Sequence, residues 1–144
     1  MSSVVLLVVL PFAGALAALT GKVTKLDLPG AIVAAAPLPV MGALLAFNLP
    51  DVLREGVLVY QLGGWPQPQG IALSLDGFAW LSSALVVVIS TLVAIASLAG
   101  RKYRSQYFFY FMLLVAGMQV VVLTSDIFTM FVGFEIVAIS AYVL

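Results

Sequence analysis

The stretch Phe128–Leu144, FTMFVGFEIVAISAYVL, is a largely apolar run whose one charged residue is Glu135, and it decides the class of fold. A run of this length and composition is typical of a helix that crosses a lipid bilayer. Counted from Asp126, Glu135 lies ~13 Å along a helix axis, close to the midplane of a ~30 Å hydrocarbon layer. An ionisable group at that depth is costly and commonly belongs to an ion or proton path, which makes a functional role the first hypothesis. The alternative is a protonated glutamate that only hydrogen-bonds a neighbouring helix.

The composition of the whole chain agrees with this stretch. The 144 residues are 64% hydrophobic and 8% charged, with a mean hydropathy of +1.23, far outside the range of soluble domains. The apolar residues gather into stretches that can span a bilayer as helices, whereas barrel strands would alternate over about ten residues. The sequence therefore predicts an all-α integral membrane protein.

Cysteine and histidine are both absent. Their absence excludes disulfides, thiolate nucleophiles, iron–sulfur clusters, His-ligated haem, most zinc sites and Ser-His-Asp triads. We expect no cofactor, no metal and no catalytic centre in this chain, so any redox chemistry that drives it takes place on another chain. The formal net charge of zero, without a dense run of Lys or Arg, argues against nucleic acid as a partner.

Five apolar segments follow one another along the chain. They are Val4–Leu19, Pro29–Leu49, Gly77–Leu98, Tyr107–Leu123 and Ile127–Leu144. The first is expected to be a membrane helix and not a signal peptide, because no Lys or Arg precedes it. The last two segments are separated by barely a turn, Thr124–Asp126, and are therefore expected to be antiparallel neighbours.

The basic residues predict an orientation in the membrane. The links Gly21–Asp27 and Gly100–Gln106 must lie on the same side, and they hold all the Lys and Arg residues except Arg54. The positive-inside rule places them in the cytoplasm. We therefore expect a multi-pass protein of the cell (inner) membrane, with the N-terminus outside and the C-terminus cytoplasmic.

The one long connection, Pro50–Asp76, carries the signals of a small outer β-hairpin. The stretches Val57–Leu62 and Ile71–Leu75 are β-branched and partly alternating, and GGWPQPQG between them is rich in turn formers. Asp76 is placed to cap the helix that follows, which we favour over a transport role because capping is the commonest task of an Asp there.

Three further residues lie within the apolar segments and admit two interpretations each. Pro37 and Pro39 interrupt the second segment, where freed carbonyl groups could line an ion site or a kink could simply pack against neighbours. Gln119 in the fourth segment is either a hydrogen-bond partner between helices or a holder of water.

A membrane carboxyl group needs a partner that this chain does not supply. Burial favours its protonated form, and a cation within ~4 to 6 Å favours the ionised form, so a moving cation would make a gate. Every Lys and Arg here lies in a loop.

The last helix stops without a glycine, a basic residue or a polar tail. We expect a fragment or a piece of a split subunit, although a natural small subunit stays open.

Two stretches resemble the antiporter-like subunits of Mrp-type Na⁺/H⁺ antiporters, membrane-bound hydrogenases and respiratory complex I. Leu62–Pro66, continued through Gly70–Ile71 to Asp76–Gly77, is similar to the outer segment of the D-type subunits in Mrp-type antiporters. Phe131–Glu135, followed by Ser140 and Tyr142, resembles the helix-five motif of the family. The resemblance implies that Glu135 is essential to ion transfer. Ser140 and Tyr142 of the same motif, and Gln119 of the fourth segment, are candidate supporting residues.

The resemblance covers nearly the whole chain but only the first third of a family member. Family members continue through further helices with intramembrane lysines that pair with the glutamate, which implies that this chain alone transports nothing. The implied partners are other membrane subunits, the lipid bilayer, H⁺ and possibly Na⁺. Whether H⁺ or Na⁺ moves, and whether a redox partner or a gradient supplies the energy, stays open.

The leading hypothesis is therefore a proton-translocating or cation/proton-antiport module of a multisubunit complex, with Glu135 as its gate carboxylate. A second hypothesis is a scaffold subunit in the membrane arm of a respiratory or hydrogenase complex, without an ion path of its own. An intramembrane enzyme is the weakest of the three, because His, Cys and a second intramembrane acid are lacking.

Overall fold

The computed structural model describes residues 3–24, 27–65, 70–100 and 105–144, with the side chains of 20–24, 27–30 and 100 left out. The described residues form six α-helices, one short 3₁₀ helix and a two-stranded sheet. In chain order these are α1 (Ser3–Thr24), α2 (Asp27–Ala35), α3 (Pro37–Glu55), β1 (Val57–Gln61), η1 (Leu62–Gly64), β2 (Ala72–Asp76), α4 (Gly77–Gly100), α5 (Ser105–Leu123) and α6 (Ile127–Val143).

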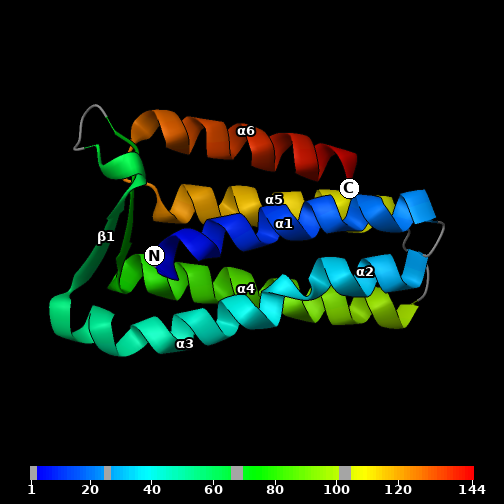
Figure 1. Ribbon diagram of the computed structural model, residues 1–144, viewed down its shortest axis with the longest axis horizontal. Coiled ribbons are helices and arrows are strands. Elements are labelled where there is room, and N and C mark those ends of the chain that lie inside the picture. The colour runs from blue at the N-terminus through cyan, green and yellow to red at the C-terminus, as the bar shows by residue number, and fades with distance from the viewer. Residues whose placement is uncertain (1–2, 25–26, 66–69, 101–104) are drawn as a thin grey trace.

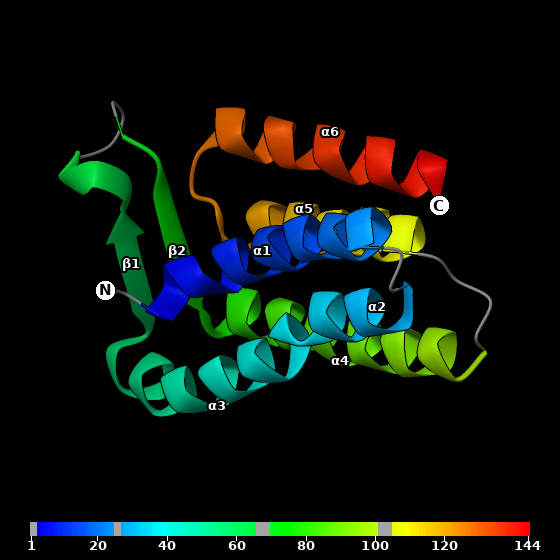
Figure 2. The ribbon, with the colours of Figure 1, turned by 45° about the vertical axis from the view of Figure 1, so that its right-hand side comes forward.

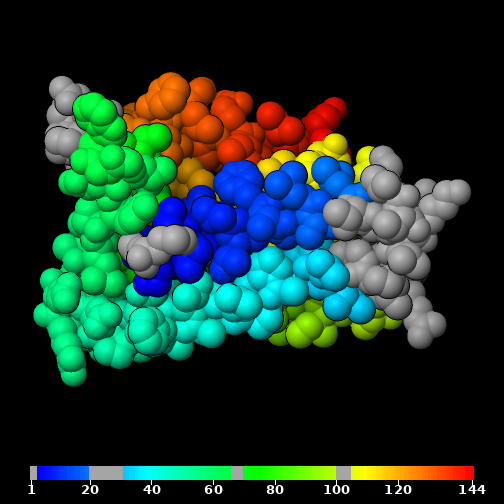
Figure 3. All heavy atoms as spheres, in the orientation of Figure 1, coloured from blue at the N-terminus to red at the C-terminus, as the bar shows by residue number. Residues whose placement is uncertain are grey.

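The helices lie side by side along one direction, and the hairpin crosses their ends (Figures 1 and 2). α1 and α5 pack along the middle of the molecule, α6 covers the far side of α5, and α2, α3 and α4 form the opposite side. The space-filling view shows α1 between α6 and the α2–α3 pair on one face (Figure 3). The predicted all-α fold with a small hairpin is confirmed, as is the antiparallel pairing of the last two helices.

The core runs along the contact between α1 and α5. Val4 and Leu7 from α1 and Phe108, Met112 and Val115 from α5 are almost fully buried. Helices within a bilayer gain no hydrophobic free energy from meeting one another, so close van der Waals packing of such side chains stabilises the contact. The small residues of α1 allow α2 to approach from the other side.

Three helical stretches are long and apolar enough to cross a bilayer, namely Ala31–Glu55, Gly77–Ala99 and Ser105–Leu123. Two shorter apolar helices, Ser3–Leu19 and Ile127–Val143, accompany them. The chain is thus a multi-pass membrane protein, and the count of five spans stays a prediction.

The second predicted segment is a broken helix. Pro37 has no N–H to donate to Val33, and Ala36 donates instead to Ile32 O at 3.0 Å and Val33 O at 3.3 Å. α2 therefore ends at Ala35 and α3 begins at Pro37. The predicted end of this segment at Leu49 is too early, because α3 continues through Pro50 to Glu55. One missing hydrogen bond did not end the helix there.

α3 ends at a glycine that adopts a positive φ, and the hairpin begins directly afterwards. Gly56 has φ +79° and donates its N–H to Val52 O at 2.9 Å, which closes the last turn. β1 and β2 pair antiparallel with Val57 opposite Asp76 and Gln61 opposite Ala72, within a residue of the predicted stretches. Of the predicted turn, residues 66–69 lie outside the described part of the chain.

α3 and α4 are joined by polar side chains near the end of the bundle that carries the hairpin. Trp80 of α4 donates its indole N–H to Leu45 O of α3 at 2.8 Å. Asn48, which is buried, donates to Leu44 O at 2.7 Å and accepts a hydrogen bond from Ser3 of α1. These bonds hold α1, α3 and α4 together at the end of the bundle where the hairpin emerges.

The two ends of the bundle agree with the expected topology. The links between α1 and α2 and between α4 and α5 leave from one end, whereas the hairpin and the α5–α6 turn lie at the other (Figure 1). The links themselves include residues 25–26 and 101–104, which lie outside the described part of the chain. The cytoplasmic assignment of that end stays a prediction.

Candidate functional site

α6, the helix that carries Glu135, is anchored by a capped N-terminus. Asp126 has an extended backbone, and its carboxylate accepts from Thr129 N–H at 2.8 Å and from Thr129 Oγ1 at 2.7 Å. Free N–H groups at a helix start need such an acceptor. Asp76 does the same for α4 by accepting from Ala79 N–H at 2.7 Å, which confirms the predicted cap.

α6 packs against α5 through two glycines that leave no room for a side chain. A Cβ on Gly117 would lie 3.0 Å from methyl groups of Ile136 and Val137, and one on Gly133 would lie 2.8 Å from a Val121 methyl. We call this contact, centred on Gly117 and Gly133, the glycine seam. Small residues let two membrane helices bring their backbones together in this way.

Glu135 lies on the opposite side of α6. One residue turns a helix by ~100°, so Glu135, two residues after Gly133, points roughly away from α5. Its side chain is exposed, as are Phe128, Phe131 and Tyr142 on the same outward face, at 72%, 60% and 92%. Within the described residues no basic group forms an ion pair with Glu135. The outward face of α6 thus presents one carboxyl group among aromatic rings.

The structure separates the three candidate supporting residues. Tyr142 shares the outward face with Glu135, two helical turns further on. Ser140 lies on the inward side, fully buried, and its Oγ has no hydrogen-bond partner among the described residues. Gln119 is fully buried between α4 and α5, where it accepts from Ser83 Oγ at 2.6 Å. Gln119 therefore links two helices, the first of its two predicted roles, and does not approach Glu135.

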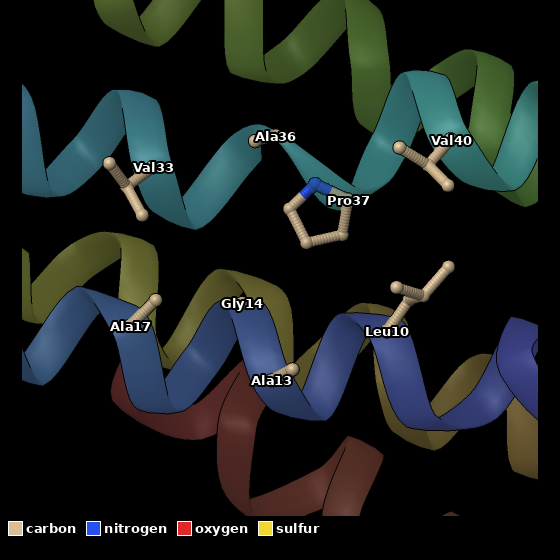
Figure 4. A pocket seen from close by; sticks show the side chains of 8 residues that line it. All are labelled: Leu10, Ala13, Gly14, Ala17, Val33, Ala36, Pro37 and Val40. Carbon is tan, nitrogen blue, oxygen red and sulfur yellow. The ribbon is translucent and has the colours of Figure 1, made fainter.

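The broken helix borders a shallow groove, not a polar site. Figure 4 shows Leu10, Ala13 and Ala17 of α1 facing Val33, Pro37 and Val40 across a cavity of about 300 Å³. Every side chain that lines it is apolar. This lining favours the packing interpretation of Pro37. An ion site at the break stays an untested prediction.

Several positioning contacts of α6 went unnoticed in the sequence. The turn before α6 pairs with the hairpin, since Ser125 N–H donates to Ala72 O at 3.0 Å and Ser125 Oγ donates to Ser74 Oγ at 2.8 Å. Asp126 carried a signal that could have been used, because an Asp after a turn and before an apolar run is a typical N-cap. The pairing of Ser125 with the hairpin had no such local signal.

The cap of α6 predicts a pH dependence of stability. The hydrogen bonds from the Thr129 side chain and backbone lower the pKa of Asp126 below its ordinary value of 3.8. A lowered pKa means stabilisation that is fully present above 3.8 and lost as pH falls through the lower value. We expect Asp126→Ala to lower the unfolding temperature in detergent micelles at pH 7, with the difference vanishing in acid. Asp126→Asn keeps an acceptor but carries no charge, so it should show a smaller loss at pH 7 that also shrinks in acid. A deficit of the Ala variant that persisted in acid would contradict the cap.

The sequence of the whole chain is similar to that of known membrane subunits. No family model matches the chain. The chain is 32% identical over 110 residues to the D-type subunit of a Na⁺/H⁺ antiporter from Alkalihalophilus pseudofirmus, covering 73% of this chain and 22% of that protein. The chain is a homologue of antiporter-like membrane subunits. It is also 31% identical to the N-type subunit of NADH-quinone oxidoreductase from Desulforudis audaxviator, over 97% of this chain and 29% of that one.

Solved structures agree with this homology. The chain superposes on a chain of the membrane-bound sulfane sulfur reductase, an archaeal respiratory membrane complex, with a TM-score of 0.87 and 30% identity. A chain of the Mrp complex from Dietzia sp. shares the fold, with a TM-score of 0.85 and 24% identity. Both matches cover 99% of this chain but 30% and 26% of the other. The chain therefore spans less than a third of the length of the proteins it matches.

Proposed function

We propose that this chain forms part of a proton-translocating or cation/proton-antiport module in a multisubunit membrane complex, with Glu135 as its gate carboxylate. The observation that carries the proposal is the placement of a single carboxyl group on the outward face of α6, deep in an apolar helix. Homology to D-type antiporter subunits and to N-type quinone oxidoreductase subunits supports the class of module.

The outward face of α6 is unsuited to lipid alone. A carboxyl group near the bilayer midplane costs roughly 2.5 to 3.5 kcal/mol in helix insertion. The aromatic side chains beside Glu135 could face lipid, but the carboxyl group needs a hydrogen-bond donor, water or a cation. We therefore expect a further membrane segment, from another subunit or from sequence beyond this stretch, to cover Glu135 and to offer a basic group.

The remaining predicted features belong to the same proposal. α2 and α3 would together make one span, so that the six helices cross the membrane five times. The hairpin end would face outward and the end with the basic links would face the cytoplasm. The proposed cargo is H⁺, with Na⁺ as a further candidate, since both use carboxylate oxygens.

The experiment that tests the proposal separates transport from assembly. Vesicles containing the complex with Glu135→Ala should show the normal amount of assembled complex and no coupled ion movement above background. A scaffold role predicts the reverse, because a glutamate that only joins helices would be needed for assembly. Normal exchange by the Ala variant would exclude Glu135 as the gate.

A further inference from the structure

The outer end of α6 is tied to the hairpin by directional bonds. Ser125 donates its N–H to Ala72 O at 3.0 Å and its hydroxyl to Ser74 Oγ at 2.8 Å, and Leu73 forms a β-bridge with Thr124. We call these contacts the outer clamp. β2 thus bonds β1 along one edge and the α5–α6 turn along the other.

The strand that holds the clamp is itself firmly placed. Leu73 and Leu75 of β2 are 4% and 0% exposed and belong to the core, where β2 contacts α1, α4 and α5. β2 also runs into α4 without a loop, and Asp76 caps that helix. Movement of the clamp would therefore require movement of α4 or of the core.

The glycine seam holds α6 from the side. A Cβ on Gly117 would lie 3.1 Å from Gly133 O, so the two backbones are already in contact. Gly133 is two residues from Glu135, and the clamp at Ser125 is ten residues away. The close fit of the seam fixes how far α6 stands from α5. The clamp supplies the directional bonds that resist sliding.

We propose that Ser74 and Ser125 are positioning residues for Glu135. Together with the glycine seam they hold the carboxyl group at a fixed depth and direction throughout ion exchange. Glu135 is then a stationary group, and the change in its surroundings comes from the group that faces it. This inference rests on the proposed function of Glu135.

A disulfide across the clamp tests whether α6 stays still. The chain has no cysteine, so the Ser74→Cys/Ser125→Cys variant introduces its only two thiols. The two hydroxyl oxygens are 2.8 Å apart, close enough for a ~2.05 Å S–S bond, and Ser125 is exposed, so an oxidant can reach the pair. Ion exchange is measured in vesicles with the complex before oxidation, after oxidation and after reduction, with each single Cys variant as a control.

We expect the disulfide to form readily and the oxidised variant to exchange ions within about twofold of the reduced one. A loss of tenfold or more on oxidation, restored by reduction and absent from the single variants, would show that the outer end of α6 moves and would overturn the proposal. Failure of the disulfide to form in the assembled complex would also overturn it, because the clamp would not be closed.

A second measurement separates positioning from stability. Gly133→Ala should displace α6 from α5 and shift the pH midpoint of exchange, whereas Gly42→Ala, with only Val87 at 3.9 Å from the added Cβ, should not. The clamp disulfide should reduce that shift, and an unchanged pH profile in Gly133→Ala would contradict positioning. The proposed function fails separately, if Glu135→Gln leaves exchange intact in the same vesicles.

Discussion

Glu135→Gln is expected to reduce coupled ion exchange to the level of vesicles without the complex. Glutamine keeps the size and polarity of the side chain, so α6 should insert and pack as before, but it cannot take up or release a proton. Glu135→Asp keeps the carboxyl group and withdraws it by one methylene. A displacement of about 1 Å can cost ~100-fold, so the Asp variant should retain a small fraction of the exchange. The measurement is the rate of pH change in vesicles after a cation pulse.

Glu55 provides the matched control for this prediction. It is an exposed acid and the last residue of α3, at the end that leads into the hairpin. Glu55→Gln makes the same chemical change and should leave exchange unaltered. If both Gln variants exchanged ions at the normal rate, the outward carboxyl group of α6 would have no part in the transfer.

Gly14→Ala is expected to destabilise the helix bundle. A Cβ at Gly14 of α1 would lie 2.6 Å from Ala34 O, 2.9 Å from Met112 Cε and 3.0 Å from Pro37 Cγ. The Met112 side chain can move, but the carbonyl oxygen at the end of α2 cannot move without shifting the helix. Overpacking of this kind typically costs about 1–3 kcal/mol. Unfolding of the purified chain in micelles, followed by circular dichroism, measures the loss.

Gly42→Ala is again the control, because Gly42 also lies inside an apolar helix. The nearest atom to its added Cβ is 3.9 Å away, an ordinary contact. Alanine is up to ~1 kcal/mol better than glycine in a helix, so this variant should be neutral or more stable. Equal stability of the two variants would mean that α1 and α2 are not in the close contact described above.

Local rules predicted much of the fold. The hairpin and the Asp76 cap each depend on a few neighbouring residues, whose turn and capping chemistry is visible in the sequence. Proline chemistry marked the second segment as disturbed near Pro37 and Pro39 but did not say which proline would interrupt the helix. The end of α3 was misplaced at Leu49 because Pro50 and Gly56 both signal a stop, and only the neighbouring structure decides which one acts.

Such local rules predicted less of the candidate site, because the direction in which its side chains face depends on neighbouring helices. The depth of Glu135 follows from counting residues, but the direction it faces depends on where α5 lies. Gln119 could equally have faced α6 or α4 until its bond to Ser83 placed it. The glycine seam and the outer clamp join segments that are distant in sequence or belong to different helices, so a single sequence gives no direct sign of them.

The bond between the Trp80 indole and Leu45 O gives the bundle a natural optical reporter. The chain has two tryptophans, and the other, Trp65, is 64% exposed beside the hairpin. With Trp65 replaced by phenylalanine, emission would come from Trp80 alone, and its wavelength would depend on whether the indole stays bonded between α3 and α4. Separation of that helix pair could then be followed by fluorescence in real time, without any attached dye.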